Sequence, residues 1–109
     1  MAADETVTLT GQSGTPITFY KYPWGTPLAA VGGVYAALRF DQSGGSAVCI
    51  GQTGNLSERF DNHHHAYGFA RQRVTHVAAL RVESEAQRRA IEEDLVRNYR
   101  PALNQTPHG

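Results

Sequence analysis

The stretch GGVYAALRFDQSGGSAVCIG, residues 32–51, contains two apolar runs separated by a turn-rich segment. The apolar residues at every second position of the first run are Val34, Ala36, Leu38 and Phe40. This alternation is typical of a strand that is buried on one face. The segment DQSGG is typical of a turn, and SAVCI predicts a second strand with Cys49 on the face opposite to Val48 and Ile50. We therefore expect two adjacent strands here.

Further strand patterns lie on both sides of this pair. The segments TVTLT (6–10) and ITFYKY (17–22) predict an N-terminal β-hairpin. The side chains expected to meet on one face of this hairpin are Val7, Leu9, Ile17 and Phe19. The segment VTHVAALRV (74–82) predicts a third central strand of the sheet.

The first helix is predicted directly after the second central strand. Asn55 is followed by Glu58 in a pattern that resembles a capping box. We therefore expect a helix that begins near Leu56. It should end before Gly68, because glycine readily adopts the left-handed conformation that terminates helices.

The best helical pattern in the chain lies near the C-terminus. We expect this helix to begin at Glu83 or Ser84 and to run to about Tyr99, because the Arg100-Pro101 pair that follows ends a helix. The order β-β-β-β-α-β-α predicts an α+β domain with a small, mainly antiparallel sheet flanked by helices.

Composition narrows the function classes. The 109 residues carry no net charge, which argues against a strong non-specific grip on nucleic acid. Residues 59–109 nevertheless hold eight cations, all of them arginine, the side chain suited to phosphate. A chain of this length forms one compact domain, in which residues 1–31 would add a hairpin extension to a domain of residues 32–109.

The sequence favours a cytoplasmic protein with no membrane partner. Its single cysteine cannot form an internal disulfide. The N-terminal segment MAADETV lacks the basic start and apolar run of a secretory signal. The longest weakly polar stretch, Leu28 to Leu38, is too short to span a bilayer.

One carboxylate of the last helix falls among apolar residues. At about 100° per residue, Glu92 lies within the stripe that contains Ile91 and Leu95, whereas Glu93 and Asp94 point to solvent. A carboxylate aimed at the core must be paired, protonated or bound to a cation. The alternative to a cation-binding role is that Glu92 forms a purely structural salt bridge to Arg88, four residues earlier.

The first helix carries a similar feature. Arg59 lies on the side of the apolar Leu56 and Phe60, and His63 follows it at i, i+4 spacing. An exposed arginine beside a solvated histidine is the ordinary explanation for such a pair. The three consecutive histidines, 63–65, diverge by about 100° each on a helix, so they do not converge on one zinc ion.

Taken together, these features resemble the GIY-YIG nuclease superfamily over residues 32–104. The residues that match the family's motifs, in chain order, are Gly33-Val34-Tyr35 for the first triplet, Cys49-Ile50-Gly51 for the second, Arg59 and His63 on the helix that follows, Glu92 on the last helix, and Tyr99-x-Pro101-x-x-Asn104 at the end. The ordered set is much more specific than any one of these motifs alone.

The resemblance implies a metal-dependent endonuclease that hydrolyses phosphodiester bonds of nucleic acid, DNA rather than RNA. In such an enzyme Glu92 would hold a single Mg²⁺ or Mn²⁺ ion, which retains several waters. Arg59 would stabilise charge on the phosphoryl oxygens, and Tyr35 would orient the attacking water. His63 would assist proton transfer or contact phosphate, and Asn104 would fix the C-terminal loop or a metal-bound water.

One position departs from the family pattern. Cys49 stands where the second triplet usually begins with tyrosine, and a thiol is a weak hydrogen-bond donor. We expect Tyr35 and Cys49 to face the same pocket, with space beside Cys49 because Ala37 and Ala47 are small. A module of this fold that binds nucleic acid or a protein partner without catalysis is the alternative function.

Overall fold

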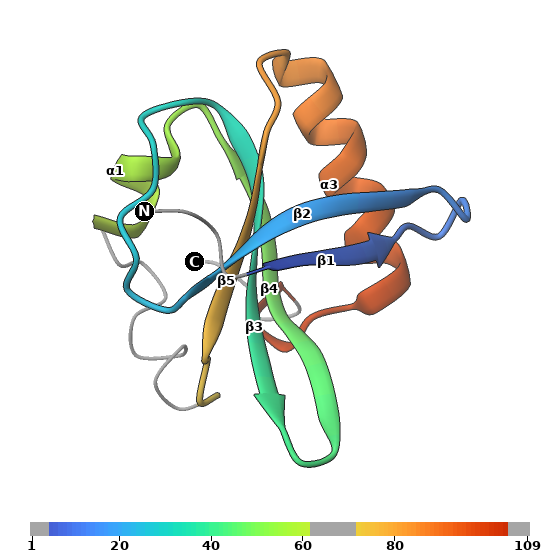
Figure 1. The fold of residues 1–109 in the computed structure, drawn as a ribbon. Helices are drawn as coiled ribbons and strands as arrows, with labels where there is room; N and C mark the ends of the chain where they lie inside the picture. Colours follow the sequence, from blue (N-terminus) through green and yellow to red (C-terminus); the bar gives the residue numbers. More distant parts are fainter. Residues whose placement is uncertain (1–4, 62–71, 105–109) are drawn as a thin grey trace.

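The computed structural model describes residues 5–61 and 72–104, except the side chains of residues 60 and 61. These residues form a sheet, two α-helices and a short 3-10 helix (Figure 1). The strands are β1 (Glu5–Thr10), β2 (Pro16–Pro23), β3 (Gly33–Asp41), β4 (Gly44–Thr53) and β5 (His76–Arg81). The helices are α1 (Leu56–Asp61), α3 (Glu85–Tyr99) and the 3-10 helix η1 (Ala102–Asn104). The predicted α+β class is confirmed.

All five strands belong to one antiparallel sheet with the order β1-β2-β5-β3-β4. Strand β5 therefore lies between β2 and β3, and it joins the N-terminal hairpin to the rest of the sheet. The predicted hairpin register is confirmed, because Val7 pairs with Phe19 and Leu9 with Ile17. Within the described residues, β4 forms one edge of the sheet, beside the C-terminal segment.

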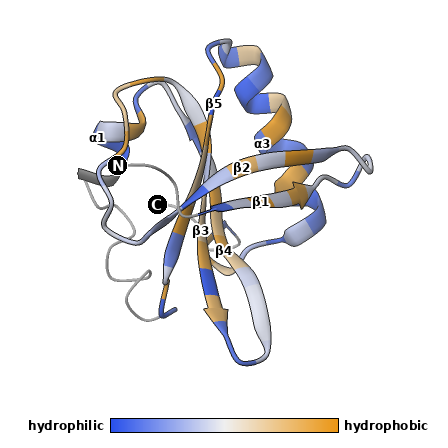
Figure 2. Cartoon of the chain, viewed as in Figure 1, coloured by the Kyte–Doolittle hydropathy of each residue, from blue (hydrophilic) through white to orange (hydrophobic). Residues whose placement is uncertain are grey.

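The two faces of the sheet carry different helices (Figure 1). Helix α3 covers the face with the larger hydrophobic core, whose buried members are Leu9, Phe19, Val34, Ala36, Leu38, Ile50, Ala78 and Leu95. Helix α1 covers the opposite face, where Leu56 packs against Tyr35 and Ala79. Hydrophobic residues are concentrated in the central strands between the two helices (Figure 2). Because side chains alternate along β3, Tyr35 faces α1 while its neighbours face α3.

The ends of helix α3 agree with the predicted signals. The Ser84 hydroxyl accepts a hydrogen bond from the Gln87 amide at 3.2 Å, as an N-cap does. Arg100 adopts the left-handed conformation (φ 44°), and its amide donates to the Val96 carbonyl at 2.8 Å. The helix therefore ends immediately before Pro101, as the sequence predicts.

Helix α1 begins at Leu56, as predicted, but with only half of a capping box. The Asn55 side-chain oxygen accepts from the Glu58 amide at 3.3 Å. The Asn55 amide donates instead to the Thr53 hydroxyl at 3.1 Å, so Glu58 does not complete the reciprocal bond. The predicted end of this helix near Gly68 lies outside the described residues.

Asp94 lies at the surface, as predicted, but its side chain is not free in solvent. Its carboxylate accepts hydrogen bonds from the Ser13 amide at 2.9 Å and the Ser13 hydroxyl at 2.7 Å. The Tyr99 hydroxyl, farther along the same helix, accepts from the Thr10 amide at 2.9 Å. These bonds attach the β1–β2 turn to α3, so the hairpin extension and the last helix form one structural unit. Neither α-helix in the described ranges has the length and apolar content needed to span a bilayer.

Candidate active site

Tyr35 and Arg59 form the centre of the candidate site. The Arg59 Nε donates a hydrogen bond to the Tyr35 hydroxyl at 2.7 Å. The guanidinium carbon lies 5.3 Å from the centre of the tyrosine ring, within the range of a cation–π contact. Tyr35 is only 3% exposed, and Arg59 is half-buried. Arg59 is therefore held against the sheet, and the explanation of a freely exposed arginine is wrong.

Gly51 provides the space that this arrangement needs. It pairs with Tyr35 across β3 and β4, and the tyrosine ring lies over it, since a Cβ at Gly51 would overlap the hydroxyl end of that ring. The absence of a side chain at Gly51 therefore lets the Tyr35 hydroxyl reach toward edge strand β4. Gly51 therefore has a steric role, because any larger residue there would displace the Tyr35 ring.

Glu92 lies on α3, beside the same edge, and is half-buried. The alternative salt bridge to Arg88 is wrong, because the Arg88 guanidinium donates to Gln52 and to the carbonyls of Val82 and Glu83 at 2.8–3.1 Å. Among the described residues, no hydrogen bond or ion pair to the Glu92 carboxylate is formed. A half-buried carboxylate without a local partner is suited to receive a cation.

The electrostatics link Glu92 to the other residues of the site. Burial raises the pKa of the Glu92 carboxyl, and the nearby Arg89 charge opposes this effect only in part. The negative charge of Glu92 in turn contributes to the raised pKa values of Tyr35 and Cys49. The carboxylate on α3 is thus close enough to influence groups that lie on the α1 face of the sheet.

Asn104 closes the edge of β4 next to Glu92. Its side-chain oxygen accepts from the Ile50 amide and its side-chain nitrogen donates to the Ile50 carbonyl, both at 2.8 Å. Asn104 therefore fixes the C-terminal segment onto the strand. A hollow of about 350 Å³ lies here, lined by Glu92, Glu93, Val96, Arg97 and Asn104.

Cys49 lies on the α1 face with Tyr35, but the two side chains belong to different hydrophobic clusters, and the space predicted beside Cys49 is filled. Trp24 and Leu103 pack against Ala37 and Cys49. Ala47 lies on the other face, because the register shifts between Ala37 and Leu38. Burial raises the pKa of the Cys49 thiol to about 11, so the thiol is neutral at pH 7. A tyrosine at this position would have to displace the surrounding side chains.

Trp24 is a residue of the site that the sequence analysis did not identify. It packs against Cys49, but in the sequence it stands in the turn-rich segment PWGTP. A lone tryptophan in a turn is the one signal that could have drawn attention to it. His63 and the two histidines after it lie outside the described residues. Within residues 5–61 and 72–104 there is no group of three or more histidine, cysteine or acidic residues that could bind a metal together.

The environment of Tyr35 gives a testable titration. Burial is the main reason that the pKa of Tyr35 rises to about 12, against the lowering effect of Arg59. Because the folded-state pKa lies above the unfolded value near 10, the stability contribution is complete below pH 10 and is lost as the pH rises toward about 12. We expect thermal unfolding temperatures to fall more steeply over this range in the wild type than in Tyr35→Phe. If the unfolding temperature falls equally steeply with pH in the two proteins, the pKa of Tyr35 is not raised by burial.

Comparison of the chain with protein-family models, with curated proteins and with solved structures finds no match.

Proposed function

We propose that this protein is a metal-dependent endonuclease that hydrolyses phosphodiester bonds of nucleic acid, DNA in preference to RNA. The observation that carries this proposal is the hydrogen bond from Arg59 to Tyr35 over Gly51. The half-buried Glu92 carboxylate supports it, because its charge acts on Tyr35. A guanidinium, a phenol and an unpaired carboxylate at one edge of a sheet supply the groups that phosphodiester hydrolysis uses.

Glu92 fits the role of metal ligand. It is a lone, half-buried carboxylate whose pKa is raised by burial, so a bound cation would relieve the cost of its charge. Mg²⁺ and Mn²⁺ accept sites with one protein carboxylate, because water and substrate phosphate supply their other ligands. When bound, the ion would neutralise charge on the leaving oxygen.

Arg59 is placed to contact the scissile phosphate. Its bond to Tyr35 uses Nε, and among the described residues no hydrogen bond uses its two terminal nitrogens. These donors form the planar fork that binds phosphoryl oxygens, and their contact strengthens as charge develops in the transition state. Tyr35 thus fixes the orientation of the guanidinium before substrate binds.

The raised pKa of Tyr35 limits its chemical role. With a pKa of about 12, the phenol is neutral at pH 7, so it orients the attacking water by hydrogen bonding and does not remove its proton. We assign the proton transfer to His63, four residues after Arg59 in the sequence, because histidine titrates near neutral pH. Asn104 holds the C-terminal segment beside Glu92.

The proposal is tested by incubating supercoiled plasmid with the protein in Mg²⁺, in Mn²⁺ and in EDTA. We expect conversion to the nicked form with either metal and none in EDTA. Cleavage that persists in EDTA would contradict the metal requirement. We place the enzyme in the cytoplasm, where its buried free thiol, Cys49, stays reduced.

The alternative is a module of the same fold that binds without cleaving. The buried neutral thiol of Cys49 supports it, since this position offers no second hydroxyl to hold a water. A well-folded protein that remains inert with Mn²⁺ on single-stranded DNA, duplex DNA and RNA would favour this alternative.

A further inference from the structure

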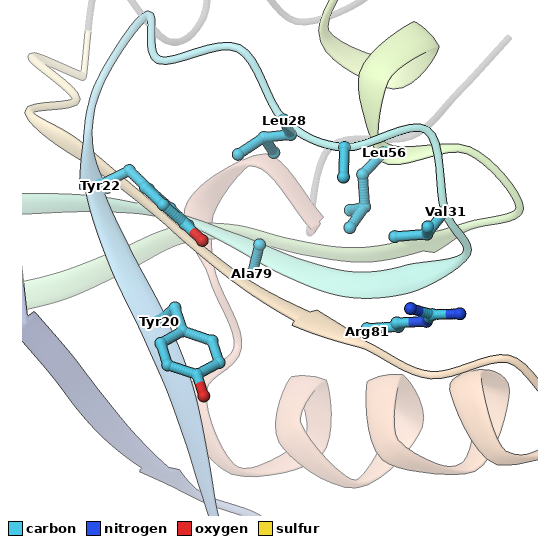
Figure 3. Close-up of a pocket in the computed structure, with 8 residues that line it drawn as sticks. Tyr20, Tyr22, Leu28, Val31, Leu56, Ala79 and Arg81 are labelled. Atoms are coloured by element: carbon cyan, nitrogen blue, oxygen red, sulfur yellow. The ribbon is translucent and has the colours of Figure 1, made fainter. Parts of the chain in front are cut away.

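A hollow of about 240 Å³ lies on the α1 face of the sheet, away from the Glu92 edge (Figure 3). Its walls include two tyrosines of β2, one arginine of β5 and apolar residues of the loop before β3; among them are Tyr20, Tyr22, Leu28, Val31, Ala79 and Arg81. Figure 3 shows the two tyrosines on one side of the hollow and Arg81 on the other.

The sheet register places this hollow in line with the candidate active site. Tyr20 pairs with Ala79, Ala79 pairs with Tyr35, and Tyr35 pairs with Gly51, so these residues form one row across four strands. Strands lie about 4.8 Å apart, so Tyr20 and Tyr35 are separated by about 10 Å along this row. Ala79 lies between them in this row and lines the hollow. Leu56 of α1 lines the hollow, and Arg59 follows it on the same helix.

The chemistry of the walls fits an unstacked nucleobase. Tyr20 is 55% exposed, which is unusual for a large aromatic side chain, and an exposed aromatic ring provides a surface on which a base can stack. The volume is smaller than the roughly 300–1,000 Å³ of sites for drug-sized ligands, so it suits one planar ring system. Among the residues that the structure describes, Arg81 is bound only to the exposed Glu83, at 3.2 Å. This is a weak surface pair that a phosphate can replace.

We propose that this hollow binds a base of single-stranded nucleic acid, next to the nucleotide whose phosphate Arg59 contacts. Tyr20 and Tyr22 hold the base, and Arg81 contacts the adjoining backbone phosphate. Bases in a duplex are stacked and paired, so the subsite accepts single strands or locally opened duplex and excludes intact duplex. The inference rests on the proposed nuclease function and specifies the form of its substrate.

Binding in EDTA tests the subsite without requiring cleavage. The probe is a fluorescein-labelled oligothymidylate, measured by fluorescence anisotropy at low salt, alone and as a duplex with oligoadenylate. We expect Tyr20→Ala to weaken single-strand binding roughly tenfold or more, because one stacked base is worth about 1–3 kcal/mol. Tyr20→Phe keeps the ring and should bind as the wild type does. Neither change should alter duplex binding.

Two further variants separate the subsite from general charge effects. Arg81→Gln should reduce the dependence of single-strand affinity on salt by about 0.7 in the slope of log K against log salt. Arg89→Gln is the matched control, because it removes an exposed arginine of α3 that also forms a surface pair, with Glu85 at 2.8 Å, and it should leave this slope unchanged.

The outcomes distinguish this inference from the proposed function. Equal single-strand affinity in Tyr20→Ala and the wild type, or no single-strand binding by the wild type, would overturn the subsite even if plasmid is nicked. Loss of binding in Tyr20→Ala with retention in Tyr20→Phe would support the subsite even if the wild type cleaves nothing.

Discussion

Replacing Glu92 with glutamine is expected to slow plasmid nicking in Mg²⁺ about 100-fold or more, which corresponds to roughly 3 kcal/mol of transition-state stabilisation. Glutamine keeps the shape of the side chain but removes the charge. Glu92 is the only protein ligand in the proposal, so this change removes the carboxylate charge that would hold the ion.

Glu93→Gln is the matched control, since it makes the same chemical change one residue away on an exposed side chain that lines the same hollow. We expect this variant to retain most of the wild-type rate. The rates are measured from the loss of supercoiled plasmid over time. Similar rates in the two variants would remove Glu92 from the mechanism.

Replacing Arg59 with alanine should also lower the nicking rate about 100-fold, the typical effect of removing one donor to developing charge. Arg59→Lys should recover only part of this loss, because lysine keeps a positive charge but lacks the planar fork and the Nε that binds Tyr35. Arg59→Ala also removes the hydrogen-bond donor to the buried Tyr35 hydroxyl, which costs about 1 kcal/mol of folding stability.

Arg100→Asn is the control for Arg59→Ala. It removes one positive charge from an exposed position, and asparagine tolerates the left-handed conformation found there. We expect a nicking rate close to that of the wild type. An equal loss in Arg59→Ala and Arg100→Asn would show that net charge, and not the contact with Tyr35, determines the rate.

The strands and helix ends could be predicted from local patterns. Alternation in β3 and in the N-terminal hairpin follows from burial of one sheet face, and Ser84 and Arg100 mark the ends of α3 because capping depends on adjacent residues. The position of β5 between β2 and β3 could not be predicted in this way, since strand order depends on pairings between distant segments. The bond from the Ser13 hydroxyl to Asp94 could not be predicted for the same reason, because it joins distant segments.

For the candidate site, the sequence could single out residues but not their contacts. Helical periodicity identifies Glu92 and Arg59 as polar residues on apolar faces, but it does not identify their partners. The bond from Arg59 to Tyr35 requires the glycine at position 51 and the pairing of β3 with β4. The packing of Trp24 against Cys49 joins a turn to a distant strand, so the size of neighbours in sequence gave the wrong expectation of free space.

The central claim is that Arg59 and Glu92 act in one site on the same phosphate. The most direct test is the nicking rate of the double variant Arg59→Ala/Glu92→Gln in Mn²⁺, compared with each single variant. Groups that act as a unit give losses that do not multiply. We therefore predict that the double variant is about as slow as the slower single variant. If the two losses in rate multiply instead, Arg59 and Glu92 act independently and do not share one site.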